Sequence, residues 1–181
     1  MSIADTISGL IDSPESFIKT NENGAFSLAG FIGYFVGTLS FFIFLRMFNL
    51  VPAGTFSFFI LFATLLCGNF IFAGIIHLFL ELMGKKGDAL KLFFLSGIAE
   101  FFWCILIPLG FAAKLNFLNS VVVLFTVFGL VIAARIIFAK YIYRLGGFKA
   151  FIAIATPYFV LSMGGFIFAI CVFAWVIWLI V

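Results

Sequence analysis

Residues 56–80 read FSFFILFATLLCGNFIFAGIIHLFL, a stretch without a single Asp, Glu, Lys or Arg. A helix needs about 20 residues to cross a hydrocarbon core about 30 Å thick, and this stretch is longer than that. It shows none of the alternation between polar and apolar residues that marks a strand of a membrane barrel. The stretch therefore predicts a transmembrane helix.

Four more apolar runs of similar length lie on either side of it, at 25–48, 90–112, 117–139 and 151–180. The joints between the runs are short and contain residues that break helices, among them Pro52, Gly84 and Gly146. Short joints make neighbouring helices antiparallel. The sequence thus predicts an all-α polytopic membrane protein: a bundle of five transmembrane helices over 25–181 and a cytoplasmic amphipathic segment over 1–24.

The composition agrees with a lipid environment. Hydrophobic residues make up 66 % of the 181 positions and charged residues 9 %, against roughly 45–50 % apolar residues in soluble domains. The mean hydropathy is +1.35. A net charge of +3 is too small for a nucleic-acid partner. Three cysteines stand alone inside apolar runs without metal or redox spacing, so we expect small buried hydrophobic side chains at Cys67, Cys104 and Cys171.

The first residues combine a helical pattern with acidic side chains and lack the pattern of a cleavable signal. Apolar residues recur at helical spacing at Ile3, Ile7, Leu10 and Ile11. Ser13-Pro14-Glu15 then has the pattern of a helix start, with Ser as the cap and Pro in the first turn. We expect a short interfacial helix followed by a second helix anchored on lipid through Phe17 and Ile18; the alternative is a mobile tail.

The basic residues predict the orientation. With a cytoplasmic N-terminus, the outer joints hold only Arg46 and Lys114, and the inner segments hold Lys19, Lys85, Lys86, Lys91, Lys140, Arg144 and Lys149. This bias follows the positive-inside rule. We therefore expect a multi-pass protein of the cell membrane with Val181 on the side opposite the N-terminus. A reporter fused to Val181 that is active only in the cytoplasm would disprove this topology.

Three polar residues fall at membrane depth, where each is costly unless it is paired or hydrated. Glu100 and Arg135 each lie nine residues, about 13 Å, from a basic residue at the same membrane face, and His77 lies about 10 Å deep. We expect His77, Glu100 and Arg135 to form an intramembrane polar cluster. Its role is either a structural contact or a transport site, and the long side chain of Arg135 has the alternative of reaching the headgroups.

Two glycine-containing inner turns concentrate positive charge. The expected contacts to anionic lipid or headgroups are Lys85, Lys86, Lys91, Lys140, Arg144 and Lys149. The alternative is that these residues only set the topology. No catalytic motif is found, and the sequence predicts a protein that is not an enzyme and has no catalytic residue, metal site or cofactor.

The layout as a whole resembles one known family. Ser13-Pro14-Glu15-Ser16-Phe17 precedes the first run, His77 and Gly84-Lys85-Lys86-Gly87 close the second, and Gly146-Gly147-Phe148-Lys149 leads into the fifth. This arrangement resembles the Yip-type (Ypt/Rab-interacting protein) membrane domain, in a short prokaryotic-like form. The resemblance implies five helices and a cytoplasmic N-terminus. For eukaryotic members the resemblance implies roles in vesicle traffic through small GTPases. Those members carry a longer soluble N-terminal region with an acidic-Leu-Gly-Pro motif, which this sequence does not show.

Two functions follow as expectations. The first is a non-enzymatic integral membrane protein of the Yip type that organises or remodels the bilayer or scaffolds a membrane partner. The alternative is a small transporter or lipid translocase that uses the polar cluster around Glu100. The expected partners are membrane lipids, together with a membrane protein or a second copy of the chain.

Overall fold

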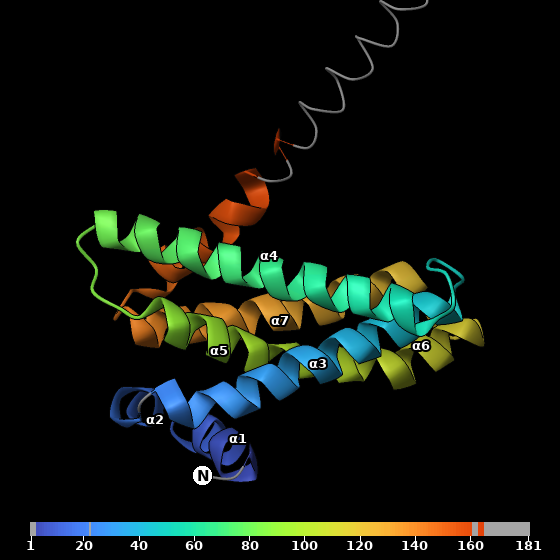
Figure 1. Ribbon diagram of the computed structural model, residues 1–181, viewed down its shortest axis with the longest axis horizontal. Helices are drawn as coiled ribbons and strands as arrows, with labels where there is room; N and C mark the ends of the chain where they lie inside the picture. Colours follow the sequence, from blue (N-terminus) through green and yellow to red (C-terminus); the bar gives the residue numbers. More distant parts are fainter. Residues whose placement is uncertain (1–2, 22, 161–162, 165–181) are drawn as a thin grey trace, which may run out of the picture.

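The computed structural model describes residues 3–21, 23–160 and 163–164, and all regular elements among them are helices (Figure 1). Two short helices come first, α1 (Ile3–Asp12) and α2 (Pro14–Thr20). The long helices are α3 (Asn23–Met47), α4 (Thr55–Leu82) and α7 (Ser120–Ile142). Between α4 and α7 lies a rod made of α5 (Ala89–Ala99), the 3-10 helix η1 (Glu100–Ile105) and α6 (Leu106–Lys114). After α7, residues Gly147–Val160 are helical again.

Four rods are long and apolar enough to cross a membrane: α3, α4, the rod Ala89–Lys114 and α7. They occupy the positions of the first four predicted spans. The fifth predicted span, 151–180, has only its beginning in the described helix Gly147–Val160, which is too short to cross. Of its remainder the structure describes only residues 163–164, and Cys171 and the final residue Val181 lie outside the described residues, so a fifth crossing stays a prediction.

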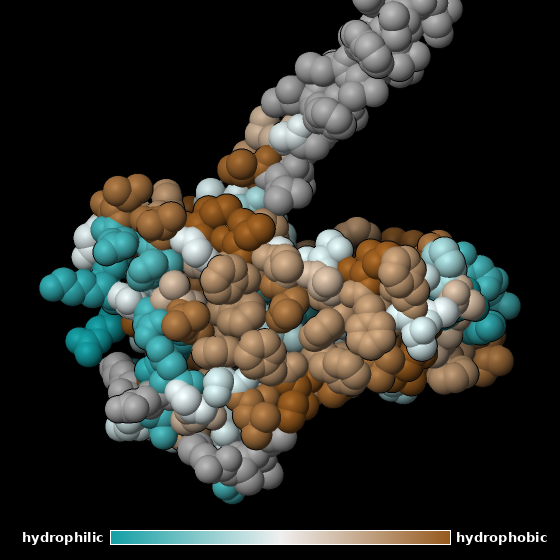
Figure 2. Space-filling view, viewed as in Figure 1, coloured by the Kyte–Doolittle hydropathy of each residue, from teal (hydrophilic) through white to brown (hydrophobic). Residues whose placement is uncertain are grey.

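The surface has the pattern of a membrane protein. Figure 2 shows a broad hydrophobic belt between two hydrophilic ends. The turns that the sequence places in the cytoplasm, 83–88 and 143–146, lie together at one end of the bundle, and the turns 48–54 and 115–119 lie at the other (Figure 1). Cys67 belongs to this exposed belt, which corrects the expectation that its side chain is buried; Cys104 is partly buried.

All four rods end in the same local geometry. A residue with positive φ lies just after each helix. The N–H of the next residue donates a hydrogen bond to the carbonyl oxygen five residues earlier, which closes the last turn as in the Schellman motif. The four residues are Asn49, Gly84, Asn116 and Arg144. In the turn after α7, the residue with left-handed backbone geometry is thus Arg144, although Gly146 and Gly147 lie close by.

The closest packing in the bundle is between α3 and the α5–η1 segment. Gly30, Gly33 and Gly37 form one face of α3, and a Cβ on Gly33 would lie 2.1 Å from the carbonyl oxygen of Gly97. The hydroxyl of Tyr34, on the same helix, donates to the carbonyl oxygen of Phe93 at 2.8 Å. Small residues that allow such close backbone approach are a common basis of helix association in membranes. This contact fixes α5 and η1 against α3.

The third rod is interrupted at its centre by η1. Pro108 lacks an N–H, and its ring crowds the carbonyl oxygen four residues earlier, at Cys104. The tighter 3-10 geometry over Glu100–Ile105 ends three residues before this proline and includes Cys104. The interruption begins at Glu100, so the carboxylate projects from the point where the rod changes its helical geometry.

The two N-terminal helices pack against the bundle. Ile18 is 2 % exposed and shares a core cluster with Leu10, Phe26 and residues of α5 and α7. The Phe17 and Phe26 rings meet edge to face at 5.9 Å. The expectation that Ile18 anchors on lipid is therefore wrong, because its side chain is buried against protein. Phe17 is only partly buried, and its contact with lipid stays a prediction. Ser13 precedes α2 as expected, but its side chain makes no capping bond.

Two residues at the start of α5 hold this N-terminal part in place. The Lys91 ammonium donates to the carbonyl oxygens of Ile18 and Asn21, at 3.0 and 2.8 Å, and thereby caps α2. The Asp88 carboxylate accepts from the backbone N–H groups of Leu90 and Lys91 and, at 2.6 Å, from the side-chain amide of Asn23. Burial acts to raise the pKa of Asp88, but these hydrogen bonds and the Lys91 charge together lower it below its usual value.

Acid is expected to weaken this junction. Because the folded-state pKa of Asp88 is depressed, the carboxylate stabilises the fold at neutral pH, and this contribution is lost as the pH falls below about 4. Asp88→Ala removes the cap of α5 and is expected to cost about 0.5–2 kcal/mol at pH 7. The measurement is thermal unfolding in detergent between pH 7 and pH 3. A stability difference between wild type and Asp88→Asn that stays constant over this range would contradict the assignment.

Candidate functional site

The centre of the bundle contains a buried ion pair. Glu100, at the start of η1, is 5 % exposed, and Arg135, on α7, is 7 % exposed. The Arg135 Nη2 group donates to Glu100 Oε1. The pair removes the charge that either residue alone would carry inside the membrane. The alternative in which Arg135 extends to the headgroups is thereby wrong.

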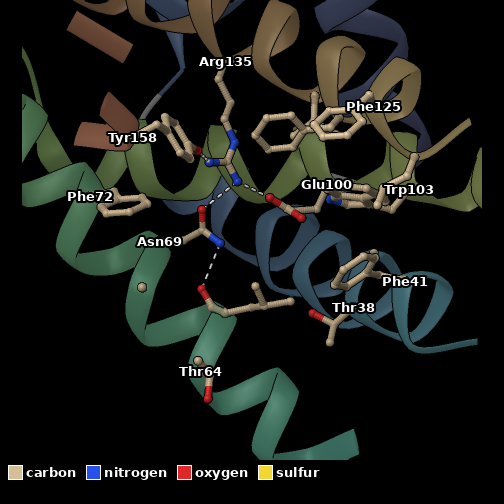
Figure 3. Close-up of a pocket in the computed structure, with 16 residues that line it drawn as sticks. Thr38, Phe41, Thr64, Asn69, Phe72, Glu100, Trp103, Phe125, Arg135 and Tyr158 are labelled. Carbon is tan, nitrogen blue, oxygen red and sulfur yellow. Dashed lines mark hydrogen bonds and ion pairs between the residues drawn. The ribbon is translucent and has the colours of Figure 1, made fainter. Parts of the chain in front are cut away.

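Two further residues complete the polar cluster around the guanidinium. Arg135 Nη2 also donates to Asn69 Oδ1 on α4 at 2.6 Å, and Nη1 donates to the hydroxyl of Tyr158. Asn69 is itself oriented by a bond from its amide to the carbonyl oxygen of Leu65 at 2.8 Å. Figure 3 shows these groups converging on Arg135 from three helices. Within the described part of the chain, the buried Arg135 Nε has no partner.

His77 does not join this cluster, which corrects the predicted trio. Its Nδ1 lies 3.0 Å from the hydroxyl of Tyr143, and its Nε2 lies 3.7 Å from Glu81 Oε2. These contacts tie the end of α4 to the turn after α7, at the end of the bundle. Burial raises the pKa of Tyr143, and the charges of Asp88 and Glu81 add to this effect. His77 is therefore part of a connection between two helix ends.

Asn69 and Tyr158 are the cluster members that sequence reasoning did not assign. Asn69 has a visible signal, because it is the single amide in the uncharged run 56–80. Tyr158 has no such signal, since a tyrosine in an apolar run is equally typical of an interfacial position. Its place beside Arg135 depends on the path of the helix Gly147–Val160.

The polar cluster forms the floor of a pocket of about 380 Å³. The walls are mostly apolar and come from α3, α4, η1 and α7, as Figure 3 shows. The lining residues are Gly37, Thr38, Phe41, Thr64, Leu65, Gly68, Asn69, Phe72, Glu100, Trp103, Leu124, Phe125, Phe128, Val131, Arg135 and Tyr158. Such a combination of apolar walls and a few convergent polar groups is typical of small-molecule sites.

The pocket lies between α4 and α7. In the described helices no Cα atom of α4 comes within 8 Å of a Cα atom of α7, whereas α5 contacts both helices. Thr64 on α4 and Phe125 on α7 line the pocket and are exposed at the surface of the bundle. The surface at this depth is the hydrophobic belt. Within the part of the chain that the structure describes, the pocket is thus open at the side, in the plane of the apolar surface.

The predicted headgroup contacts divide into two groups. Lys91 donates to two carbonyl oxygens at the end of α2, and its role as a lipid contact stays a prediction. Lys86, Lys140, Arg144 and Lys149 are exposed, and Lys85 is partly exposed. The Lys140 ammonium lies 5.3 Å from the centre of the Tyr141 ring. These five residues remain candidates for headgroup contacts at one end of the bundle.

Comparisons of the chain with protein families, with curated proteins and with solved structures found no match.

Proposed function

We propose that this protein is a non-enzymatic integral membrane protein that organises bilayer lipid by holding one membrane amphiphile in its lateral pocket. The four apolar rods support a multi-pass membrane protein. The pocket between α4 and α7 carries the finer proposal, because it combines a side entrance in the apolar belt with a polar floor. Assignment to the Yip type remains part of the proposal and rests on the layout of the sequence.

The charge balance of the floor supports binding without chemistry. Glu100 and Arg135 neutralise each other, and Asn69 and Tyr158 occupy further guanidinium N–H groups. A carboxylate held in this way is a poor general base, because losing its charge would strand the arginine. The cluster is suited to hold the polar end of a ligand in a defined orientation.

Filling the pocket is expected to abolish lipid retention. Gly68 lines the pocket, and a Cβ at this position meets no atom within 4 Å, so Gly68→Leu places a side chain into empty space. The matched control is Gly129→Leu, because a Cβ on Gly129 also meets nothing and Gly129 is exposed on α7. The measurement is native mass spectrometry of delipidated protein after addition of a total membrane lipid extract.

We expect one retained lipid on the wild type and on Gly129→Leu, and at least a tenfold lower occupancy on Gly68→Leu, because the leucine excludes part of the ligand from van der Waals contact. Equal unfolding temperatures of the two variants would show that both are folded. Equal occupancy on Gly68→Leu and on the control would refute the lateral pocket as the lipid site.

The interrupted third rod favours a second candidate, a small transporter or lipid translocase. Discontinuous helices near the membrane midplane are a feature of transporter binding sites, and η1 begins at Glu100. If the protein is a translocase that uses the Glu100 carboxylate, the Glu100→Gln variant should fold normally. It should no longer move a fluorescent phospholipid across the bilayer of proteoliposomes. Wild-type protein that moves no phospholipid excludes the lipid translocase and leaves the binding function in place.

A further inference from the structure

The floor and walls of the lateral pocket restrict the kind of amphiphile that fits, and this inference rests on the proposed function. We infer that the pocket takes a single-chain amphiphile that ends in a hydroxyl group. The hydroxyl lies against the Glu100–Arg135 pair, and the chain leaves through the opening between α4 and α7.

The orientation follows from the position of the polar atoms. The carboxylate and the guanidinium lie at the floor, whereas Phe41, Phe72 and Phe125 contribute to the walls (Figure 3). A hydrocarbon end pressed against the ion pair would desolvate charged groups without replacing any hydrogen bond. The polar end of the ligand therefore points inward, and the apolar part continues into the belt.

The volume limits the size of the inserted part. The pocket of about 380 Å³ is at the small end of the range of about 300–1,000 Å³ that ligand sites cover. This space accommodates a small polar group and part of one chain. A glycerophosphate group with two attached chains is too large. The pocket thus favours a single-chain ligand over a whole phospholipid.

The charges at the floor select a neutral polar end. Glu100 and Arg135 compensate each other. A carboxylate ligand would compete with Glu100 for the guanidinium, and an ammonium ligand would compete with Arg135 for the carboxylate. In either case a charge inside the membrane loses its partner, which is unfavourable. A neutral end leaves the pair intact.

The hydrogen-bonding capacity of the floor points to a donor. Figure 3 shows one carboxylate oxygen of Glu100 at Arg135 and the other turned away from it. Among the described residues, Glu100 Oε1 accepts from Arg135, and no side chain donates to Oε2. An ionised carboxylate accepts and does not donate, so its partner must supply a proton. A hydroxyl is the smallest neutral group on a lipid chain that does so.

A matched set of sixteen-carbon probes tests this inference: hexadecan-1-ol, hexadecanoate, hexadecylammonium and hexadecane. Each probe is added to the delipidated full-length protein in detergent at pH 7, and the one-to-one adduct is quantified by native mass spectrometry. We expect hexadecan-1-ol to bind about tenfold or more tightly than each of the other three, because only its hydroxyl bonds the carboxylate without displacing a charge. Gly68→Leu should reduce its binding at least tenfold, and Gly129→Leu should not.

Glu100→Gln provides a readout that a purely structural role of the residue would not change. The amide removes the negative charge and leaves Arg135 without its counterion, so the preferred probe should switch from hexadecan-1-ol to hexadecanoate. Binding of hexadecane as tightly as hexadecan-1-ol would overturn the inference, and so would an unchanged preference in Glu100→Gln.

The inference and the proposed function fail separately. In one outcome, the wild type retains lipid from the total extract, Gly68→Leu does not, and hexadecan-1-ol neither binds nor displaces that lipid. The inferred ligand class is then wrong, and the proposed function of the pocket stands. If Gly68→Leu reduces the binding of neither the extract lipid nor any probe, the inferred ligand class and the proposed function are both wrong.

Discussion

Replacement of Glu100 with leucine is expected to lower the free energy of unfolding by about 3–5 kcal/mol, because removing one partner leaves the other charge buried without compensation. Arg135 is 7 % exposed, and its remaining partners Asn69 and Tyr158 are neutral. The loss should appear in equilibrium unfolding in mixed micelles and as a lower unfolding temperature in detergent.

Two further variants separate the charge effect from loss of packing. Glu100→Gln should be much milder, because the amide oxygen still accepts from Arg135. The double variant Glu100→Leu/Arg135→Leu should recover most of the stability, because neutral residues replace both members of the pair. Normal stability of the single Glu100→Leu variant would mean that the carboxylate is hydrated, and it would contradict the buried pair.

The second large effect is expected at the contact between α3 and α5. Gly33→Ala places a Cβ 2.1 Å from the Gly97 carbonyl oxygen and 2.8 Å from its carbonyl carbon, and backbone atoms of a neighbouring helix cannot move aside as a flexible side chain can. We expect a loss of about 3 kcal/mol or more, at the upper end of the range for overpacked cores. The measurement is again unfolding in mixed micelles.

The matched control for this substitution is Gly129→Ala. No atom lies within 4 Å of a Cβ at Gly129, so the same chemical change meets no obstacle and should gain up to about 1 kcal/mol from the better helix propensity of alanine. Equal stability of Gly33→Ala and Gly129→Ala would show that α3 and α5 are farther apart than described.

The same contact connects the fold to the pocket. A Cβ on Gly37 would lie 2.7 Å from Glu100 Cβ, so the position of α3 determines where the carboxylate sits relative to Arg135. Gly33→Ala is therefore expected to lower binding to the pocket as well as stability. A substitution on the outer surface of α7 has no comparable route to the site.

The position of a residue along the bundle axis is the property of the site that the sequence predicts well. Counting residues from Lys91 and from Arg144 puts Glu100 and Arg135 at equal depth, because each helical residue adds 1.5 Å along the axis. The structure brings these two residues into contact. The same count also put His77 nearby, and there it failed, because the His77 ring turns toward Tyr143 at the end of the bundle.

The direction in which each side chain points around its helix depends on how the helices pack, and the sequence does not predict it. In a soluble helix an apolar stripe marks the buried face, but helices in lipid are apolar on all sides and carry no such mark. The sequence therefore gave no reason to place Tyr158 at Arg135 or the Lys91 ammonium at the end of α2.

The helical class, the positions of four apolar rods and the matching level of Glu100 and Arg135 along the bundle follow from the sequence, because hydropathy and axial rise are local quantities. The tertiary structure decided which residues meet: Asn69 and Tyr158 at the ion pair, Ile18 against the bundle, and the pocket between α4 and α7. These contacts depend on helix rotation and spacing, which are set by close packing at sites such as Gly33 and Gly97, between residues far apart in the chain.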